Sequence, residues 1–253
     1  GDSILVEFPR GKKMLIDGGG LHEDRFDIGK NVIAPFLWKK KIRRIDTLVL
    51  THPDPDHLKG LIFIASQFSI GQFWDNGYQT ESESYLQLKQ ILGERKIKTH
   101  SLNEETLPQM INGVEILVLN PPAWKATQRK ASNLRALDNS SLVMKLRFQD
   151  VSVLLTGDIE KEAEERILRK DLPLRSDILK IPHHGSSSSS TPLFLERVKP
   201  TYAILNVGER NIGRLPNPEV LKRYLRLGSE ILRTDKHGAI TVTTDGENIQ
   251  VKT

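Results

Sequence analysis

The sequence predicts an α/β fold in which two β-sheets pack face to face with helices on the outside. Strand and helix patterns alternate along the first half of the chain, and a second group of strands with its own helices follows residue 138. No stretch resembles a linker, and 253 residues suffice for one large domain. Two such groups in one domain bury their apolar faces against each other.

Alternating and amphipathic patterns assign the elements of the first half. A hairpin comes first, because two β-type runs flank a turn at 9–12. Apolar residues at helical spacing mark the helices that follow. The expected strands are 3–8, 13–17, 47–50, 72–75, 97–100 and 114–119, and the expected helices are 27–40, 58–65 and 82–95.

The second half repeats strands with intervening helices. Two helices begin with a polar residue and a proline, at Thr191-Pro192 and Asn217-Pro218, because a cap and a fixed φ favour the first turn. Residues 120–138 show no convincing period and carry several cations, so we expect a mobile basic loop. The expected strands are 141–148, 151–156, 177–181, 201–206, 230–233, 239–243 and 248–252, and the expected helices are 160–170, 192–198 and 217–227.

The composition favours an anionic partner and excludes thiol chemistry. The net charge of +5 and the pI near 9.3 suit nucleic acid, phosphate or anionic lipid. The absence of cysteine excludes thiolate ligands, a cysteine nucleophile and disulfides. No apolar run reaches the ~18 residues of a membrane-spanning helix. Because the chain begins with Gly1 and enters a strand at once, we expect 1–253 to be a single domain excised from a longer membrane protein.

Four metal-capable side chains fall within six residues after an apolar strand: His52, Asp54, Asp56 and His57. Two prolines between them stiffen the loop and remove two backbone donors. Two imidazoles and two carboxylates so close together are explained by a cation that neutralises the acids. The stretch therefore predicts a metal site at the end of a strand.

Further polar groups also follow strands. Asp17 precedes three glycines, Asp158 follows a hairpin, and His183 and His184 follow the next strand. In layered α/β folds, sites are built at strand ends. Alone, Asp158 is equally explained as a helix cap and the histidine pair as structural, so the combination is what predicts one site.

Together these motifs resemble the metallo-β-lactamase fold superfamily, and more narrowly the C-terminal domain of the ComEC family of competence DNA-uptake channels. The resemblance implies a four-layer αβ/βα sandwich with two mixed β-sheets, helices outside and up to two metals at one edge. The motifs that carry it are Gly1-Asp2-Ser3, Met14-Leu-Ile-Asp-Gly-Gly19, Leu50-Thr-His-Pro-Asp-Pro-Asp-His57, Asn139-Ser-Ser-Leu-Val143, Leu155-Thr-Gly-Asp158, Ile181-Pro-His-His-Gly-Ser186 and Arg233-Thr-Asp235.

The resemblance also implies which residues hold the metals. We favour His184 over His183, because the Gly-Ser that follows it is similar to the family's His-x-Ser pattern, and the choice stays open. Asp2 and Asp17 would support the site without binding metal. The implied ligands are His52 and Asp54 for the first metal, Asp56, His57 and His183 or His184 for the second, and Asp158 as the bridge between them.

Two departures from the superfamily pattern affect the first metal position. Asp54 stands where a second histidine is usual, and the usual third histidine has no counterpart. His100 is the only other histidine between 57 and 183, and it does not fall where the motif would. The position is richer in oxygen ligands than a zinc site, so we expect one or two divalent ions, with Mn²⁺ favoured and Zn²⁺ or Mg²⁺ as alternatives.

The resemblance implies a metal-dependent nuclease that degrades the non-transported strand during DNA uptake in natural transformation. Two divalent ions would lower the pKa of a water between them and neutralise charge at phosphorus, while Asp56 would orient or accept the proton. Two alternatives are a phosphodiesterase acting on a small substrate and a non-catalytic DNA-binding module with a vestigial metal site.

Other residues are expected to contact phosphate or DNA. Ser186 opens a serine run at a helix N-terminus, whose amides and hydroxyls can bind phosphate. Lys180 and Asn139 would position phosphate or support the ligands. By resemblance alone, the chain would be joined to a membrane channel of the same polypeptide on the outer face of the cell membrane. The cations expected to contact DNA, as a single strand or an incoming duplex, are Lys125, Arg129, Lys130 and Arg135.

Overall fold

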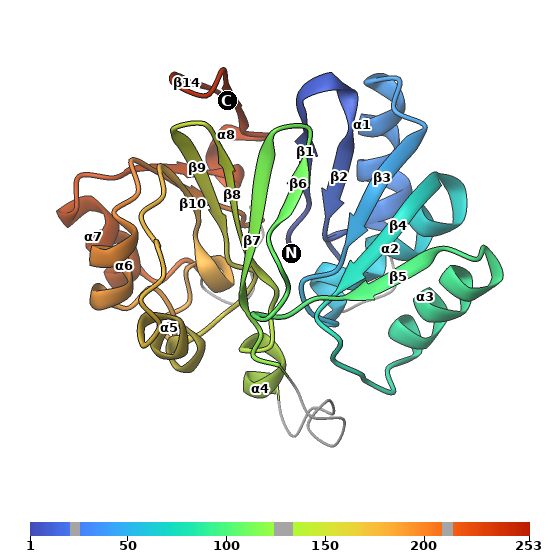
Figure 1. The fold of residues 1–253 in the computed structure, drawn as a ribbon, viewed down its shortest axis with the longest axis horizontal. Coiled ribbons are helices and arrows are strands. Elements are labelled where there is room, and N and C mark those ends of the chain that lie inside the picture. Colours follow the sequence, from blue (N-terminus) through green and yellow to red (C-terminus); the bar gives the residue numbers. More distant parts are fainter. Residues whose placement is uncertain (21–25, 124–133, 209–214) are drawn as a thin grey trace. The chain divides into compact units, whose positions relative to one another are not determined.

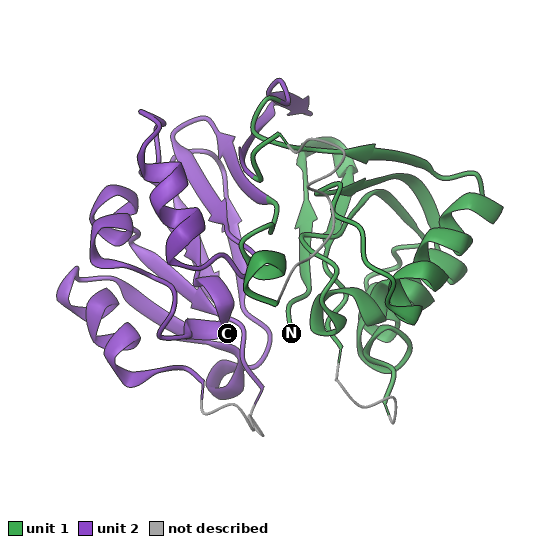
Figure 2. Ribbon diagram, turned by 90° about the horizontal axis from the view of Figure 1, so that it is seen from below, with its two compact units in different colours: residues 1–105, 121–142 green, residues 106–120, 143–253 purple. Residues whose placement is uncertain are grey.

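The computed structural model describes residues 1–20, 26–123, 134–208 and 215–253. They form two compact units, Gly1–Glu105 with Pro121–Leu142 and Thr106–Asn120 with Val143–Thr253, which are coloured separately in Figure 2. Each unit has its own sheet and its own hydrophobic core. The predicted α/β class with two mixed sheets is confirmed, whereas the single domain and the four-layer packing stay predictions.

Unit 1 is built on a five-stranded sheet in the order β1-β2-β3-β4-β5 (Figure 1). β1 and β2 pair antiparallel across a short turn, and β2 to β5 are parallel because helices or longer segments connect them. The strands are β1 (Ile4–Glu7), β2 (Lys13–Ile16), β3 (Arg44–Val49), β4 (Ser69–Asp75) and β5 (Lys98–Ser101), and the helices are η1 (Pro9–Gly11), η2 (Gly29–Ile33), α1 (Ala34–Lys39), α2 (Pro55–Gln67), α3 (Glu83–Glu94) and α4 (Leu134–Asp138).

The core of unit 1 joins three helices to the sheet. Buried side chains recur in α2 at Leu58, Leu61, Ile64 and Ala65, the spacing of one helical face. They pack in one cluster with apolar residues from α1, α3 and the strands. Burying this stripe fixes α2 against the sheet and thereby fixes the loop that precedes it.

Unit 2 contains a seven-stranded sheet in the order β12-β11-β10-β9-β8-β7-β6. The strands from β12 to β9 are parallel, and those from β9 to β6 are antiparallel; β13 and β14 form a separate hairpin. Its elements are β6 (Gln109–Ile111), β7 (Val114–Asn120), β8 (Val143–Phe148), β9 (Val151–Leu155), α5 (Lys161–Leu168), β10 (Ile178–Lys180), η4 (Pro182–Gly185), α6 (Pro192–Val198), β11 (Tyr202–Leu205), α7 (Pro218–Arg226), β12 (Glu230–Arg233), α8 (Thr234–His237), β13 (Thr241–Thr244) and β14 (Ile249–Lys252).

Short elements are where the sequence prediction was wrong. The stretch 120–138 was expected to be a loop throughout, yet its end forms the helix α4. The strand β6 and the helix α8 were not expected either. Elements of three to five residues are shorter than the window over which a helical or alternating period shows itself.

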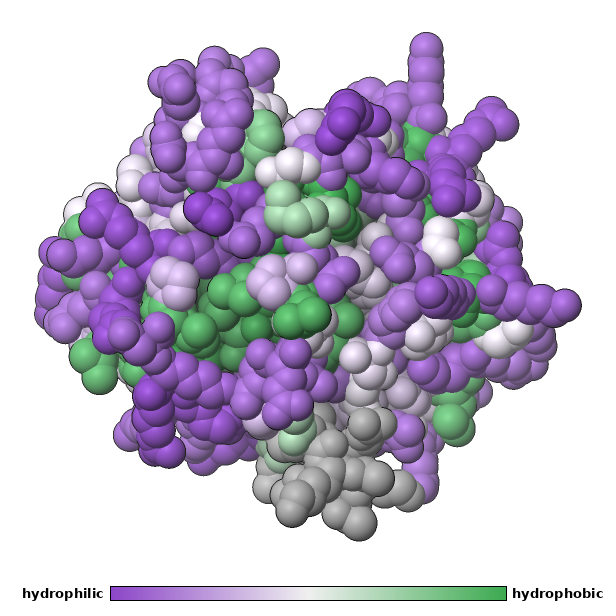
Figure 3. Space-filling view, in the orientation of Figure 1, coloured by the Kyte–Doolittle hydropathy of each residue, from purple (hydrophilic) through white to green (hydrophobic). Residues whose placement is uncertain are grey.

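The surface is largely polar in the view of Figure 3, with apolar side chains in smaller areas between charged ones. Among the described residues, four large apolar side chains from one segment are substantially exposed: Phe26, Val32, Phe36 and Trp38. None of the described helices combines the length and the apolar character needed to cross a bilayer.

Candidate metal centre

The loop between β3 and α2 carries the first cluster of functional side chains. β3 ends in a buried run, and α2 begins at Pro55 with Asp54 in the extended conformation of an N-cap. His52 lies in the loop and His57 in the first turn of α2, and both are fully buried. Their ring centroids are 4.3 Å apart. The proline at the first helical position starts the helix where its missing N–H costs nothing, which brings the two imidazoles together.

Asp17 holds His57 in place from behind. Asp17 Oδ1 accepts a hydrogen bond from the Thr51 amide at 2.8 Å, and its Oδ2 lies 2.7 Å from Thr51 Oγ1 and 2.8 Å from His57 Nδ1. Burial raises the pKa of Asp17, while His57 and Thr51 act in the opposite direction. A proton on His57 Nδ1 shared with this carboxylate leaves Nε2 as the nitrogen able to bind a cation.

Glycines allow the segment after Asp17 to lie against the start of α2. A side chain on Gly60 would place its Cβ 1.8 Å from the carbonyl oxygen of Gly18. The Gly18 amide donates to the carbonyl of His57 at 2.6 Å, and the Gly60 amide donates to Gly19 at 3.1 Å. The close backbone approach expected of this glycine run therefore secures the turn that carries His57.

The structure adds Asp138 to the first metal position. Ligand atoms of His52, Asp54 and Asp138 all lie within 4.8 Å of one another, and His52 Nε2 is 3.7 Å from Asp138 Oδ1. Asp138 is the last residue of α4. Sequence reasoning missed it, although it directly precedes Asn139, which the resemblance had singled out. A set of one imidazole and two carboxylates is richer in oxygen than a zinc site, as Asp54 alone already suggested.

The motif that follows Asp138 fixes its position. The side-chain amide of Asn139 donates to the carbonyl of Arg135 at 3.0 Å, and Ser140 Oγ donates to the carbonyl of Leu137 at 2.6 Å. Ser141 Oγ lies 3.2 Å from His52 Nδ1. The turn thus ties the end of α4 to His52. A direct role for Asn139 at a metal or phosphate stays a prediction.

The electrostatics of this cluster fit a cation. Burial and the neighbouring carboxylate of Asp56 raise the pKa of Asp54 to about 6. The carboxylates of Asp54 and Asp56 therefore resist ionising together, and divalent metal held by these residues would offset that repulsion. Two buried imidazoles oriented by neighbours, with carboxylates beside them, form a donor set suited to a divalent metal.

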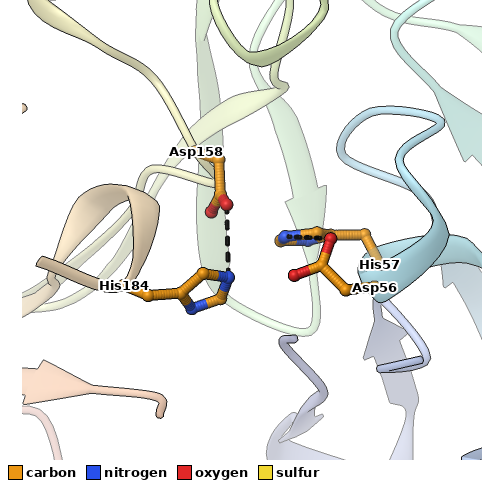
Figure 4. A group of neighbouring side chains, drawn as sticks. All are labelled: Asp56, His57, Asp158 and His184. Carbon is orange, nitrogen blue, oxygen red and sulfur yellow. Dashed lines mark ion pairs between the residues drawn. The ribbon is translucent and has the colours of Figure 1, made fainter. Parts of the chain in front are cut away.

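Unit 2 carries the second cluster, at the ends of β9 and β10. Asp158 Oδ2 lies 3.3 Å from His184 Nε2, and Asp158 Oδ1 lies 3.1 Å from Lys180 Nζ. Lys180 also donates to the carbonyl of Gly157 at 2.9 Å and is buried. Figure 4 shows the carboxylate of Asp158 facing the ring of His184 and, in unit 1, the carboxylate of Asp56 beside His57. Lys180 thus lies against Asp158 as a supporting group.

The two histidines after β10 share a left-handed backbone but face different carboxylates. His183 and His184 have φ of 47° and 50°, in the left-handed region that costs about 1–2 kcal/mol for such residues. This strained turn directs His184 to Asp158, and His184 Nδ1 lies 2.8 Å from the carbonyl oxygen of Asn206, to which it can donate. His183 instead lies 3.4 Å from Glu160. His184 Nε2 therefore faces Asp158, and the choice of His184 as the metal ligand stays a prediction.

The serine run does not offer its helix N-terminus to a phosphate, which corrects the prediction for this run. The amides of Ser190 and Thr191 donate to the two carboxylate oxygens of Glu164, at 2.6 and 2.8 Å. Glu164 is fully buried, so the protein supplies its own hydrogen-bond acceptor at the start of α6. Ser186 Oγ lies 2.8 Å from Ser188 Oγ. Contact of Ser186 with a phosphate stays a prediction.

The Glu164 interaction predicts a pH-dependent stability. Burial raises the pKa of Glu164 from 4.5 to about 7. The folded chain therefore holds this proton to a higher pH than the unfolded chain, so the free energy of unfolding falls as pH rises through this range, by up to roughly 3 kcal/mol. In Glu164→Gln this contribution is absent. Urea unfolding of both proteins at pH 5 and pH 7 measures the difference, and parallel pH profiles would contradict it.

Asp17→Asn tests the orientation of His57. The asparagine side chain presents an N–H where the carboxylate accepted one, so His57 Nδ1 becomes the acceptor and Nε2 takes the proton. We expect divalent-metal affinity to fall about 10- to 100-fold. Titration calorimetry with Mn²⁺ measures it, and Asp46→Asn, which changes a partly buried carboxylate elsewhere in unit 1, serves as control. Unchanged affinity would show that Asp17 has no part in metal binding.

The remaining predicted residues separate into two groups. Lys125, Arg129 and Lys130 lie outside the described residues. Arg135 lies on α4, with its side chain exposed. Asp2 is buried, and ligand atoms of Asp2, Asp17 and His57 lie within 4.8 Å of one another, so it belongs to the surroundings of His57.

Comparison with known proteins identifies a family match and related sequences. Residues 1–87 match the family described as the metallo-β-lactamase superfamily. The chain is 28% identical over 252 residues to ComE operon protein 3 of Bacillus subtilis, covering 95% of this chain and 31% of that protein. It is 30% identical over 211 residues to the competence protein ComA of Neisseria gonorrhoeae, covering 82% of this chain and 26% of that protein.

The fold also resembles solved structures. The metallo-β-lactamase fold protein YhfI of Bacillus subtilis superposes with a TM-score of 0.52 at 11% identity, covering 92% of this chain and 88% of that one. At this identity the likeness concerns the fold alone. The chain spans less than a third of the length of the two competence-protein relatives.

Proposed function

The chain belongs to the metallo-β-lactamase superfamily and is related to competence proteins, and on this premise we propose that it is a metal-dependent hydrolase of phosphodiester bonds, acting as a DNA nuclease. The observation that carries the proposal is the cluster of buried His52 with the partly exposed Asp54 and Asp138, together with the buried Asp17–His57 pair. Burial and the neighbouring carboxylate of Asp56 raise the pKa of Asp54, and a bound cation would offset the repulsion between these acids.

We further propose that Asp158 and His184 of unit 2 also bind divalent metal, as the superfamily resemblance implies for these residues. The proposal is tested by variants of the cluster in each unit, each of which should lower metal binding.

The residues of the chain have separable tasks in metal binding and catalysis. A bound divalent ion supplies Lewis acidity and a water of lowered pKa. Asp17 keeps His57 in the tautomer that exposes Nε2, and the carbonyl of Asn206 does the same for His184. Asp56, partly exposed at the start of α2, is placed to accept a proton at its carboxylate. The ammonium of Lys180 donates a hydrogen bond to Asp158 and stabilises the negative charge of this buried carboxylate.

DNA is the proposed substrate for two reasons. The net charge of +5 favours a polyanion, and two relatives carry names that place them in competence. By the same relationship we propose that the chain acts next to a membrane channel, on the outer face of the cell membrane. Degradation of the strand that is not taken up is the proposed role there.

The test is cleavage of linear DNA by the purified chain. With Mn²⁺ we expect shortening of labelled single- and double-stranded DNA, abolished by EDTA and restored by Mn²⁺ more than by Zn²⁺. A chromogenic phosphodiester in parallel separates a small-substrate enzyme from a nuclease. Salt-sensitive DNA binding without cleavage under any divalent ion would instead identify a binding module and end the nuclease proposal.

A further inference from the structure

A shallow groove in unit 1 lies away from the metal cluster. It has a volume of about 470 Å³ and is lined by Trp38, Lys41, Arg43, Gln67 and Phe68. These residues come from the end of α1, the segment before β3 and the end of α2. No acidic residue is among the described residues that line it.

The position of the groove in the sheet separates it from the metal ligands. It lies by the start of β3, whereas the ligands follow the end of that strand; the six residues of β3 span about 20 Å. α2 gives the same separation. It begins at the ligands, and its thirteen residues place Gln67 at the other end of a helix about 20 Å long. The groove is therefore a separate feature of the same unit.

An indole forms one wall of the groove. Trp38 is 51% exposed, although burial would be the usual way for so large a ring to contribute to the fold. One face of the ring stacks on Phe68, with centroids 5.8 Å apart and an angle of 13° between the planes. Phe68 is fully buried and fixes the ring. The indole is thus a rigid platform held at the surface.

The cations around the groove divide into neutralised and free ones. Asp46 pairs with Lys12 and Arg44, and Glu7 pairs with Lys40. Three others, Lys39, Lys41 and Arg43, are exposed and have no ion pair with any carboxylate in the described part of the chain. The rim of the groove therefore carries positive charge that no carboxylate of the described residues neutralises, on Lys41 and Arg43 beside the exposed indole of Trp38.

We infer that this groove binds single-stranded nucleic acid, with a base stacked on Trp38 and the flanking phosphates on Lys41 and Arg43. A flat aromatic ring beside unneutralised cations is the arrangement that holds a single strand without reading its sequence. Gln67 adds a polar group at the rim. The ammonium of Lys40 lies 5.8 Å from the ring centroid of the neighbouring, exposed Phe36, so positive charge also borders the apolar side chains of this segment.

The groove goes beyond the proposed hydrolysis and does not depend on it. A site remote from the metal cluster would retain a long strand while its end or an internal bond reaches the ligands. Such a groove should tighten the binding of long nucleic-acid substrates and leave the rate of hydrolysis of small phosphodiesters unchanged.

The experiment measures binding of a fluorescently labelled 20-nucleotide oligo(dT) by anisotropy, in EDTA so that no cleavage occurs. Trp38→Ala is expected to weaken binding about 5- to 100-fold, the range for loss of one stacked base. Lys41→Glu with Arg43→Glu should weaken it and lower the log–log salt slope by about one to two, since each phosphate contact contributes ~0.7. Circular dichroism checks that both variants fold.

The matched control is Lys236→Glu with Lys252→Glu, which changes the net charge equally through exposed cations of unit 2. It should bind within about twofold of the unaltered chain. The inference is overturned if Trp38→Ala binds normally or if the control weakens binding as much as the groove variant. It is also overturned if Trp38 is needed for sedimentation with phosphatidylserine vesicles and not for oligo(dT) binding. Hydrolysis of a small chromogenic phosphodiester should be unchanged in Trp38→Ala.

Discussion

Asp158→Asn is expected to reduce metal-dependent DNA cleavage by on the order of 10³-fold or more, the largest effect we expect of any single substitution. Asp158 is buried, and its two oxygens face Lys180 and His184. Asparagine keeps the shape but removes the negative charge and one acceptor oxygen, so this side chain holds a divalent cation much more weakly. Cleavage of labelled linear DNA at saturating Mn²⁺ and calorimetric Mn²⁺ binding measure the loss.

Folding has to be separated from function in this test. Removing the charge of Asp158 leaves the ammonium of Lys180 buried without its partner, which by itself can cost about 3–5 kcal/mol. Asp158→Asn with Lys180→Met removes both charges and should restore stability in urea unfolding without restoring metal binding. Asp150→Asn, an exposed acid of the same unit, is the matched control. Wild-type cleavage by Asp158→Asn would remove Asp158 from the proposed set of metal ligands.

Asp138→Ala is expected to lower Mn²⁺ stoichiometry from two ions to one and to slow DNA cleavage by about 10²-fold. Its carboxylate is one of the three donors around the first metal position, with Oδ1 3.7 Å from His52 Nε2. Without it, only His52 and Asp54 remain of that set in unit 1, too few to hold an ion firmly. Electron paramagnetic resonance of bound Mn²⁺ counts the ions.

Asp138→His replaces a carboxylate of the first metal position with a second imidazole. It therefore changes the type of donor, whereas Asp138→Ala removes the donor. Nitrogen ligands favour Zn²⁺ over Mn²⁺, so metal preference in competition binding should move toward Zn²⁺. Leu134→Ala, at an exposed position of the same short helix, controls for effects on α4 itself. If Asp138→Ala still binds two ions, the first position uses other donors and the assignment of Asp138 is wrong.

Patterns of nearby residues predicted most of the fold. The apolar stripe of α2, the Pro-initiated helix α6 and the hairpin of β1 and β2 follow from periodicity and turn chemistry, which act over a few residues. Short elements such as α4 escaped prediction, because a single turn of helix has no period to detect and is stabilised by its surroundings.

The sequence by itself determined the kind of site. The histidines, prolines and aspartates at 52–57 predict a cation-binding donor set where a strand passes into a helix, although the helix begins at Pro55, within the stretch expected to be a loop. The glycines after Asp17 predict a close backbone approach. Both depend on covalent chemistry and local sterics, which a sequence records directly. The same holds for the exclusion of thiolate ligands.

Only the tertiary structure decided which groups complete and orient that donor set. Asp138 reaches His52 through α4, the carbonyl of Asn206 orients His184, and Glu164 occupies the helix N-terminus that the serine run seemed to offer. Each partner comes from a distant part of the chain and is selected by burial. A polar group removed from water must find a hydrogen-bonding partner, and the packing of the elements determines which one it meets.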